Sequence, residues 1–232
     1  MSKAHKIGNS LKDRFLRKET VRKVGNRQKR VYFLIVCEGI KTEPNYFNAF
    51  KEELPNGTLV VSDMTVFGAG KNTKSLIDFT IKSRHNFTNN FDKVWAVFDK
   101  DSFTDDQFNS AIIKARDNDI NCAWSNEAFE LWFLLHFQLI NHAMSRADYQ
   151  AYFEREVKRA SNKDYSYKKN DPDTFKILKT YGSMANAIKW ARKLEAVETD
   201  QKYATHNPCT KVHELISQLL DPSAILSEVK SI

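Results

Sequence analysis

The chain has 232 residues, of which 41% are hydrophobic and 28% are charged. This composition is typical of a globular protein with one large or two small domains, and it excludes a collagen-like, fibrous or wholly disordered chain. No apolar run approaches the roughly 18 residues needed to span a bilayer, so we expect no membrane partner. The N-terminus lacks the apolar region of a secretion signal, and the three cysteines are far apart in the sequence. We therefore expect a cytoplasmic protein without a disulfide framework or structural zinc site.

The net charge of +7 is concentrated at the N-terminus. Residues 1–30 contain 11 Lys or Arg and 2 Asp or Glu, whereas the rest of the chain contains 25 and 27 and is slightly acidic. We expect residues 1–30 to form a flexible basic arm, because their apolar residues are too sparse to build a core. Such an arm either binds the phosphate backbone of a nucleic acid or acts as a solvated tail.

Residues 31–125 have the alternating strands and helices of an α/β domain with a mainly parallel sheet. The predicted strands cover residues 31–37, 59–67, 93–98 and 121–124. The predicted helices cover residues 42–54, 74–87 and 104–118. The strands 31–37 and 93–98 are almost continuously apolar, which is typical of central strands with helices on both sides.

Residues 126–232 are predicted to form a helical extension that packs on the α/β domain. The predicted helices cover residues 126–142, 147–160, 173–180, 182–199 and 208–220. The helix 126–142 is strongly apolar, and we expect Ser125 or Asn126 to cap it. No strand is predicted after residue 125, and the polar segment 161–173 is predicted to be an exposed loop.

Acidic residues follow two of the predicted buried strands. Glu38 comes directly after strand 31–37, and Asp99 and Asp101 follow strand 93–98. Ligands of open α/β sheets bind at the carboxyl ends of the strands, and an extended backbone would turn Asp99 and Asp101 to the same side. Carboxylates gathered there would bind Mg²⁺ or Mn²⁺, because like charges at close range are costly without a cation. The competing interpretation is that Asp99 caps a helix and Asp101 is solvated.

The order strand-Glu-Gly and then strand-Asp-x-Asp resembles the Toprim domain of topoisomerases, bacterial primases and overcoming-lysogeny-type nucleases. Longer segments resemble the RloB family, also called AbiLii-like, of bacterial proteins encoded in restriction-linked and abortive-infection loci. These segments are VCEGIKTEPNYF (36–47), VFDKD (97–101), SNEAFELWFLLHF (125–137) and NPCTKVHEL (207–215). The resemblance implies a Toprim-like fold for residues 31–125. It further implies that Glu38 acts as general acid or base in a metal centre whose Asp99 and Asp101 hold Mg²⁺.

Further residues are candidates for the same site. Glu130 is either an additional metal ligand or a first-turn acid that suits the helix dipole. The candidate substrate-binding residues, each with a turn, a cap or the core as its alternative, are Gly39, Lys41, Lys71, Asn126 and His213. Lys71 lies in the loop Gly68-Ala69-Gly70-Lys71-Asn72-Thr73, which either presents backbone N–H groups to a phosphate or is a tight turn. The spacing of this loop does not match a Walker motif, so ATP binding of that type is excluded.

These features favour a Mg²⁺-dependent phosphodiesterase, expected to be a nuclease that acts as the effector of an anti-phage system. Metal ions neutralise the phosphate and activate a water molecule, while a carboxylate transfers the proton. The alternative is a nucleic-acid-binding module without activity of its own, controlled by a partner ATPase encoded in the same locus. Nucleotidyl transfer and hydrolysis of a small nucleotide use the same chemistry. The sequence leaves open a DNA, RNA, tRNA or nucleotide substrate, the number of metals, the trigger and a homo-oligomeric state.

Deletion of residues 1–30 tests the basic arm. If the arm binds phosphates, the deletion weakens nucleic-acid binding and flattens the dependence of the binding constant on salt, because fewer counterions are released. Fluorescence anisotropy of labelled DNA and RNA at several salt concentrations measures both quantities. An unchanged affinity with an unchanged salt slope would show that the arm is a solvated tail.

Overall fold

The computed structural model describes residues 29–54, 60–70, 72–86, 90–101 and 103–228. Most of the predicted basic arm and the candidate Lys71 lie outside the described residues. The first strand begins at Lys29, so Lys29 and Arg30 belong to the sheet. The sequence had assigned these two residues to the arm. In the described part of the chain, no helix is both long and apolar enough to cross a membrane.

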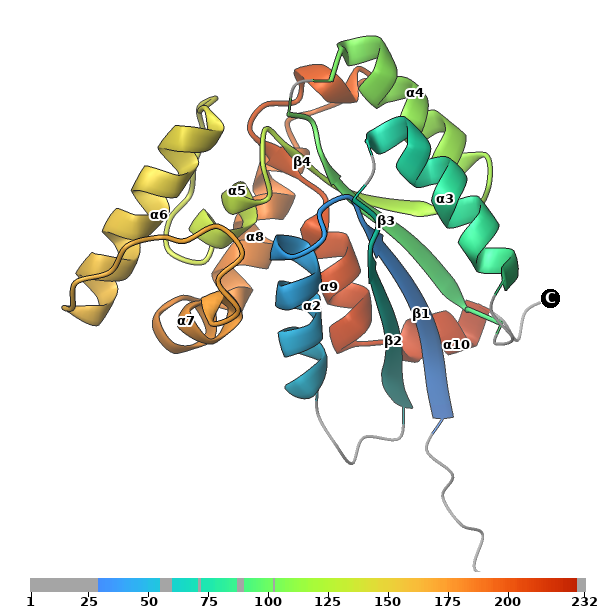
Figure 1. The fold of residues 1–232 in the computed structure, drawn as a ribbon, viewed down its shortest axis with the longest axis horizontal. Coiled ribbons are helices and arrows are strands. Elements are labelled where there is room, and N and C mark those ends of the chain that lie inside the picture. The colour runs from blue at the N-terminus through green and yellow to red at the C-terminus, as the bar shows by residue number, and fades with distance from the viewer. Residues whose placement is uncertain (1–28, 55–59, 71, 87–89, 102, 229–232) are drawn as a thin grey trace, which may run out of the picture.

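A five-stranded sheet forms the centre of the protein (Figure 1). Its strands are β1 (Lys29–Cys37), β2 (Val60–Gly68), β3 (Lys93–Asp99), β4 (Asn121–Asn126) and β5 (Cys209–Thr210), in the spatial order β2-β1-β3-β4-β5. β1 pairs in parallel with both β2 and β3, and β3 pairs in parallel with β4. The short β5 is antiparallel to β4. The predicted α/β class with a mainly parallel sheet is therefore confirmed.

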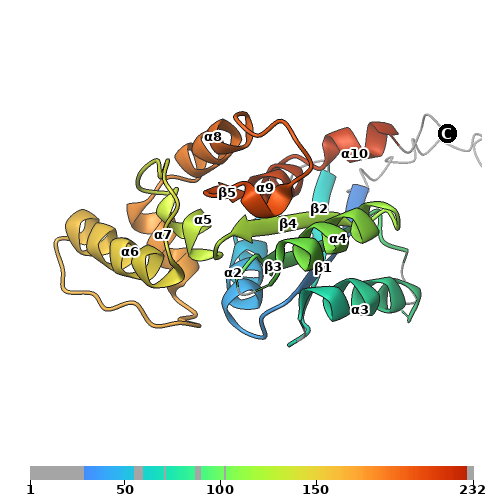
Figure 2. The same cartoon turned by 90° about the horizontal axis from the view of Figure 1, so that it is seen from above.

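Helices cover both faces of this sheet (Figure 2). The first half of the chain contributes α2 (Thr42–Glu52), α3 (Thr73–Asn86) and α4 (Asp105–Arg116). The second half contributes α5 (Glu130–Leu134), α6 (Arg146–Ser161), α7 (Thr174–Tyr181), α8 (Met184–Glu195), a 3₁₀ turn at Tyr203–Thr205, α9 (Val212–Leu220) and α10 (Ser223–Glu228). α3 and α4 lie side by side on one face, whereas α2 and α9 pack on the other. The second half is thus a mostly helical extension packed on the sheet.

Strand β1 explains why two hydrophobic cores form. Phe33 and Ile35 face the core that contains α2 and α9, and Leu34 and Val36 face the core that contains α3 and α4. All four side chains are fully buried. Because successive side chains of a strand point to opposite faces, a continuous apolar run needs cover on both sides. The first of these cores extends from β1 to α10, so both halves of the chain build it.

The predicted helix 126–142 is wrong. β4 continues to Asn126, and the short α5 begins only at Glu130 with Phe129 as its N-cap, so neither Ser125 nor Asn126 caps a helix. Every residue from 128 to 136 is buried. A segment covered on all sides has no polar face, so its apolar pattern cannot distinguish a helix from a short helical turn between buried stretches.

The predicted helix 208–220 is wrong at its beginning. Cys209 and Thr210 form β5, which extends the sheet by pairing with the end of β4, and α9 begins at Val212. A strand therefore follows residue 125, contrary to the prediction. The three predicted helices between these segments are confirmed as α6, α7 and α8, with α8 ending four residues earlier than expected.

A buried hydrogen bond joins the two halves of the chain. Trp132 Nε1 in α5 donates to Tyr46 Oη in α2 at 2.8 Å. The ring of Tyr46 also packs edge-to-face against Phe129 and Phe175. Tyr46 and Trp132 have at most 1% of their surface exposed, so water cannot replace the bond. These contacts fix α5 and α7 against α2.

We predict that Tyr46→Phe lowers the free energy of unfolding by about 1–3 kcal/mol, because it leaves the buried Trp132 N–H without an acceptor. Urea denaturation followed by tryptophan fluorescence measures the change. The matched control is Tyr32→Phe on β1, where the tyrosine is 36% exposed and the loss should be close to zero. Equal stability of the two variants would contradict a structural role for the Tyr46 hydroxyl.

Candidate functional site

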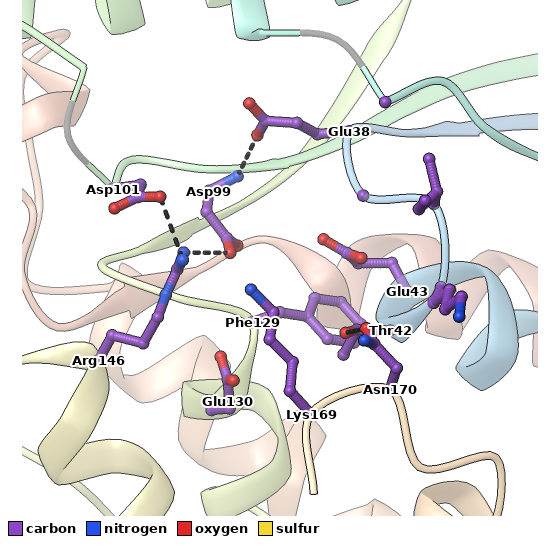
Figure 3. Close-up of a pocket in the computed structure, with 14 residues that line it drawn as sticks. Glu38, Thr42, Glu43, Asp99, Asp101, Phe129, Glu130, Arg146, Lys169 and Asn170 are labelled. Carbon is purple, nitrogen blue, oxygen red and sulfur yellow. Dashed lines mark hydrogen bonds and ion pairs between the residues drawn. The ribbon is translucent and has the colours of Figure 1, made fainter.

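A cavity of about 480 Å³ opens at the carboxyl ends of β1 and β3 (Figure 3). The sheet edge, the beginning of α2, the beginnings of α5 and α6, and the loop at residues 169–170 surround it. Five carboxylates line it, from Glu38, Glu43, Asp99, Asp101 and Glu130. Three cationic side chains also line it, from Lys41, Arg146 and Lys169. The structure therefore brings the predicted Glu38, Asp99, Asp101, Glu130, Gly39 and Lys41 to one cavity.

Glu38 lies just beyond the end of β1, where its backbone N–H donates to Val97 O of β3 at 2.8 Å. Its carboxylate accepts hydrogen bonds from the Asp99 backbone N–H at 3.3 Å and from Thr73 Oγ1 at 3.4 Å. Burial, together with the negative charges of Glu43 and Asp101, raises the pKa of Glu38 to about 7, although those two hydrogen bonds act to lower it. Glu38 is therefore poised to exchange a proton near neutral pH.

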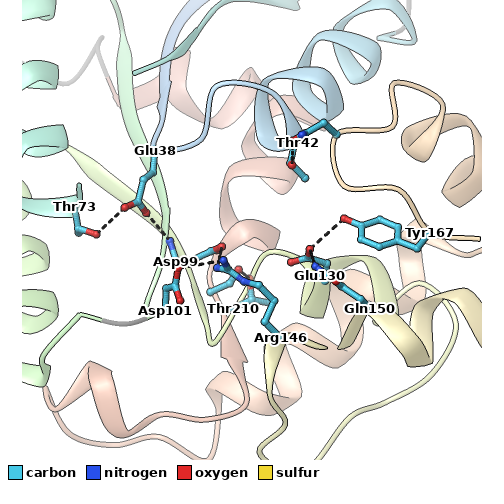
Figure 4. A network of polar contacts seen from close by, with 12 residues as sticks. Glu38, Thr42, Thr73, Asp99, Asp101, Glu130, Arg146, Gln150, Tyr167 and Thr210 are labelled. Atoms are coloured by element: carbon cyan, nitrogen blue, oxygen red, sulfur yellow. Dashed lines mark hydrogen bonds and ion pairs between the residues drawn. The ribbon is translucent and has the colours of Figure 1, made fainter. Parts of the chain in front are cut away.

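Asp99 and Asp101 meet at one arginine (Figure 4). Arg146 Nη2 lies 3.0 Å from Asp99 Oδ2, and Arg146 Nη1 lies 3.1 Å from Asp101 Oδ2. The two carboxylates converge as expected, although the backbone leaves the extended conformation, since Asp101 has φ 39°. Burial raises the pKa of Asp99 well above its usual value, and the charges of Glu43 and Glu130 add to that effect, while Arg146 opposes it.

Glu43 and Glu130 form the opposite wall of the cavity. Burial and the charge of Glu130 raise the pKa of Glu43, although Lys169 and Arg146 oppose the shift. Glu130 Oε1 accepts hydrogen bonds from Gln150 Nε2 at 2.9 Å and Tyr167 Oη at 3.1 Å. Glu43 therefore stays ionised only at a cost that a further nearby cation would relieve.

The predicted substrate residue Gly39 has a steric role in the structure. A Cβ atom at Gly39 would clash with Glu43 Oε2, so a larger residue there would displace the Glu43 carboxylate from its place in the cavity. Gly70, at φ 58°, also lines the cavity, where the loop after β2 passes close to Ile40. Beside the turn after β1, the backbone of Gly39 thus lies close to the Glu43 side chain, and the backbone of Gly70 lies close to the Ile40 side chain.

Lys41 and Lys169 lie on the rim of the cavity and form no ion pair within 4 Å among the described residues. The loop that carries Lys169 is fixed to the start of α2, because Thr42 Oγ1 donates to Asn170 Oδ1 at 2.8 Å and Asn45 Nδ2 donates to Asn170 O at 3.1 Å. Lys41 and Lys169 can therefore donate hydrogen bonds to a phosphate.

Two predicted residues lie outside this cavity. Asn126 is buried at the end of β4, where its side chain donates to Ala204 O at 2.8 Å. His213 is buried beside α8, where its Nε2 lies 3.0 Å from Glu195 Oε2 and its Nδ1 contacts Thr210 O at 3.0 Å. Both side chains are occupied by structural contacts, so the structure does not support them as substrate-binding groups at this cavity.

The sequence reasoning missed Glu43, Arg146 and Lys169. Glu43 had been assigned only to the start of a helix, and Arg146 follows Ser145, which forms a capping box with Asp148. The capping pattern predicts where α6 begins but not what its first residue touches. Lys169 was placed in the polar loop 161–173 and not at this cavity. No local sequence signal places these three residues in the cavity, because the packing of α2, of α6 and of the loop after α6 brings them to the sheet edge.

The oxygen-rich lining fits a hard divalent cation such as Mg²⁺ or Mn²⁺. Asp99 Oδ1 is buried without a hydrogen-bond partner, and carboxylates exceed cations by two among the lining residues. Arg146, however, lies between Asp99 and Asp101. Among the described residues, the group whose three potential ligand atoms come within 4.8 Å of one another lies outside this cavity, at Glu195, His213 and Glu214. In that group Lys211 Nζ contacts both glutamates, so the lysine already supplies the positive charge that a metal ion would bring.

The raised pKa of Glu38 predicts a pH-dependent effect of Glu38→Gln on stability. The pKa of about 7 in the folded protein exceeds the ordinary 4.5, so ionisation of Glu38 costs stability fully above pH 7, and the cost vanishes as the pH falls to about 4.5. Glu38→Gln should therefore raise the melting temperature by a few degrees at pH 8 in EDTA, and by less at pH 5. Differential scanning fluorimetry measures this.

The exposed Glu52 of α2 provides the matched control. Glu52→Gln should leave the melting temperature near that of the wild type at both pH values. A Glu38→Gln variant that is no more stable than the wild type at pH 8 would contradict the destabilising ionisation of Glu38.

Comparisons with known proteins give one match. The family model described as RloB-like protein matches residues 33–219, which includes the whole sheet edge and every described residue that lines the cavity. Searches of curated proteins and of solved structures found no match. Because the family model covers most of the chain, the protein belongs to the RloB-like family.

Proposed function

We propose that the protein is a Mg²⁺- or Mn²⁺-dependent phosphodiesterase, a nuclease that acts as an effector of bacterial anti-phage defence. The observation that carries this proposal is the cavity at the carboxyl ends of β1 and β3, where five carboxylates lie beside three cationic side chains. Acidic oxygens suit the metal, and the surrounding cations suit the phosphates of a polyanion. The resemblance of the Glu-Gly and Asp-x-Asp segments to the Toprim pattern supports the same assignment.

The residues divide the work by their surroundings. Asp99 and Asp101 would hold the metal ion, which when bound neutralises phosphate charge and activates water. Glu38 would transfer the proton, because its pKa of about 7 lies near the working pH. Lys41 and Lys169 at the rim would contact phosphates of the substrate. Glu130, fixed by Gln150 and Tyr167, is the candidate for an additional ligand.

One contact favours the alternative of a partner-controlled module. Arg146 pairs with both Asp99 and Asp101, so a cationic side chain of the protein itself already engages the two proposed ligands. A chain in this arrangement would be inactive until a partner, such as an ATPase encoded in the same locus, changes it. Activity that appears only after the partner is added would favour this control over an absent active site.

Substitution of the acidic residues tests the proposed activity. Asp99→Asn should abolish Mg²⁺-dependent cleavage, and Glu38→Gln should reduce it by about 10²- to 10⁴-fold through the loss of proton transfer. Cleavage of labelled DNA and RNA with Mg²⁺ or Mn²⁺, in the presence of EDTA as a negative control, measures this. Asp106→Asn, at an exposed position in the first turn of α4, is the matched control and should retain full activity. Metal-dependent cleavage that is unchanged in both site variants would refute the proposal.

A further inference from the structure

Arg146 occupies the position between Asp99 and Asp101 that a metal ion would need. Its guanidinium makes one contact to each carboxylate, at 3.0 and 3.1 Å, and does not form a two-pronged pair with either (Figure 3). The side chain is 28% exposed, compared with 12% for Asp99 and 44% for Asp101. The arginine therefore crosses the cavity and supplies the positive charge for both aspartates.

This arrangement leaves buried polar atoms on both sides without a partner. Arg146 Nε is buried and donates no hydrogen bond, and Asp99 Oδ1 is buried and accepts none. An unpaired buried donor or acceptor has lost its water without gaining a partner, so the contact is incompletely satisfied. A better partner for Asp99 can therefore displace the arginine without the loss of an ideal bidentate pair.

We propose that Arg146 and a divalent metal ion compete for Asp99 and Asp101, so that the arginine must leave the carboxylates when the ion binds. This inference rests on the proposed function, since it assumes that the two aspartates are metal ligands. A metal coordinates through the same carboxylate oxygens that now accept from Arg146. A guanidinium held between them would also repel the ion.

The fold allows the side chain to move while its backbone stays fixed. Arg146 is the first residue of α6, directly after Ser145, whose side chain accepts from the Asp148 backbone N–H. The helix start is thus capped, but the long side chain of Arg146 reaches from it into the cavity. Once released, the guanidinium stays beside the metal, where its planar donors can pair with a phosphate.

The test is a Mn²⁺ titration of the full chain without substrate, followed by electron paramagnetic resonance of free Mn²⁺. If the arginine competes, Arg146→Gln binds Mn²⁺ about tenfold more tightly than the wild type, the order expected when a charge-assisted hydrogen bond no longer opposes the ion. The matched control is Arg155→Gln on the same helix, where the arginine stacks on Tyr152 outside the cavity. This control should bind Mn²⁺ as the wild type does.

An affinity of Arg146→Gln that is equal to or weaker than that of the wild type would overturn the competition. Asp99→Asn separates this failure from that of the proposed function. If the wild type binds Mn²⁺ and Asp99→Asn does not, the metal site stands. The affinity of Arg146→Gln then decides whether the arginine competes with the ion. If Asp99→Asn binds as well as the wild type, the metal site itself is wrong, and the inference falls with it.

A measurement on the unaltered chain keeps the inference testable if Arg146→Gln does not fold. Arg146→Lys, which retains a positive charge, identifies the Arg146 Nε–H signal in a ¹H–¹⁵N spectrum by its absence. Addition of Mg²⁺ to the wild type should shift this signal, because the guanidinium leaves the aspartates. A signal that stays unchanged at saturating Mg²⁺ would show that the arginine and the ion do not exchange.

Discussion

The rest of the structure depends on covering the second face of the central sheet. β1 and β3 are apolar on both sides, so neither face can remain in water. On the face that holds α2, the cover is completed by the second half of the chain, which is joined through the bond between Trp132 and Tyr46. Burial of α5 at this place holds Glu130 at the cavity, and the chain then returns into α6, which begins with Arg146. The same packing therefore closes the core and completes the site.

This packing also creates an electrostatic cost. Carboxylates that the fold places at the sheet edge lose water, and burial raises the pKa of Glu38, Glu43 and Asp99. A protein that must bind a cation there has to remain folded before the cation arrives. Arg146 reduces the cost, because it faces Asp99 and Asp101 together. The arginine thus stabilises the folded chain, and a cation that used Asp99 and Asp101 as ligands would have to compete with it.

Long apolar runs that end in turns made β1 to β4 and most helices predictable from the sequence. β5 was not, because a strand of two residues has no periodicity, and α5 was not, because its segment is buried on every side. In the site, Glu38, Asp99 and Asp101 were predictable, since each lies at or just after the end of a central strand. Glu43 and Arg146 were not, because their part in the cavity depends on where α2 and α6 pack.

The alternation of side chains along the strands assigns different tasks to the acids. Val97 and Phe98 face opposite cores, so Asp99 returns to the side of Val97, where Arg146 lies. Glu38 follows Cys37 and faces the other side, where Thr73 at the start of α3 donates to it. The two acids approach the cavity from opposite faces and are linked through the Asp99 backbone N–H and not through their carboxylates. A metal held by Asp99 and Asp101 therefore leaves Glu38 free to carry a proton, which favours proton transfer over metal ligation as its task.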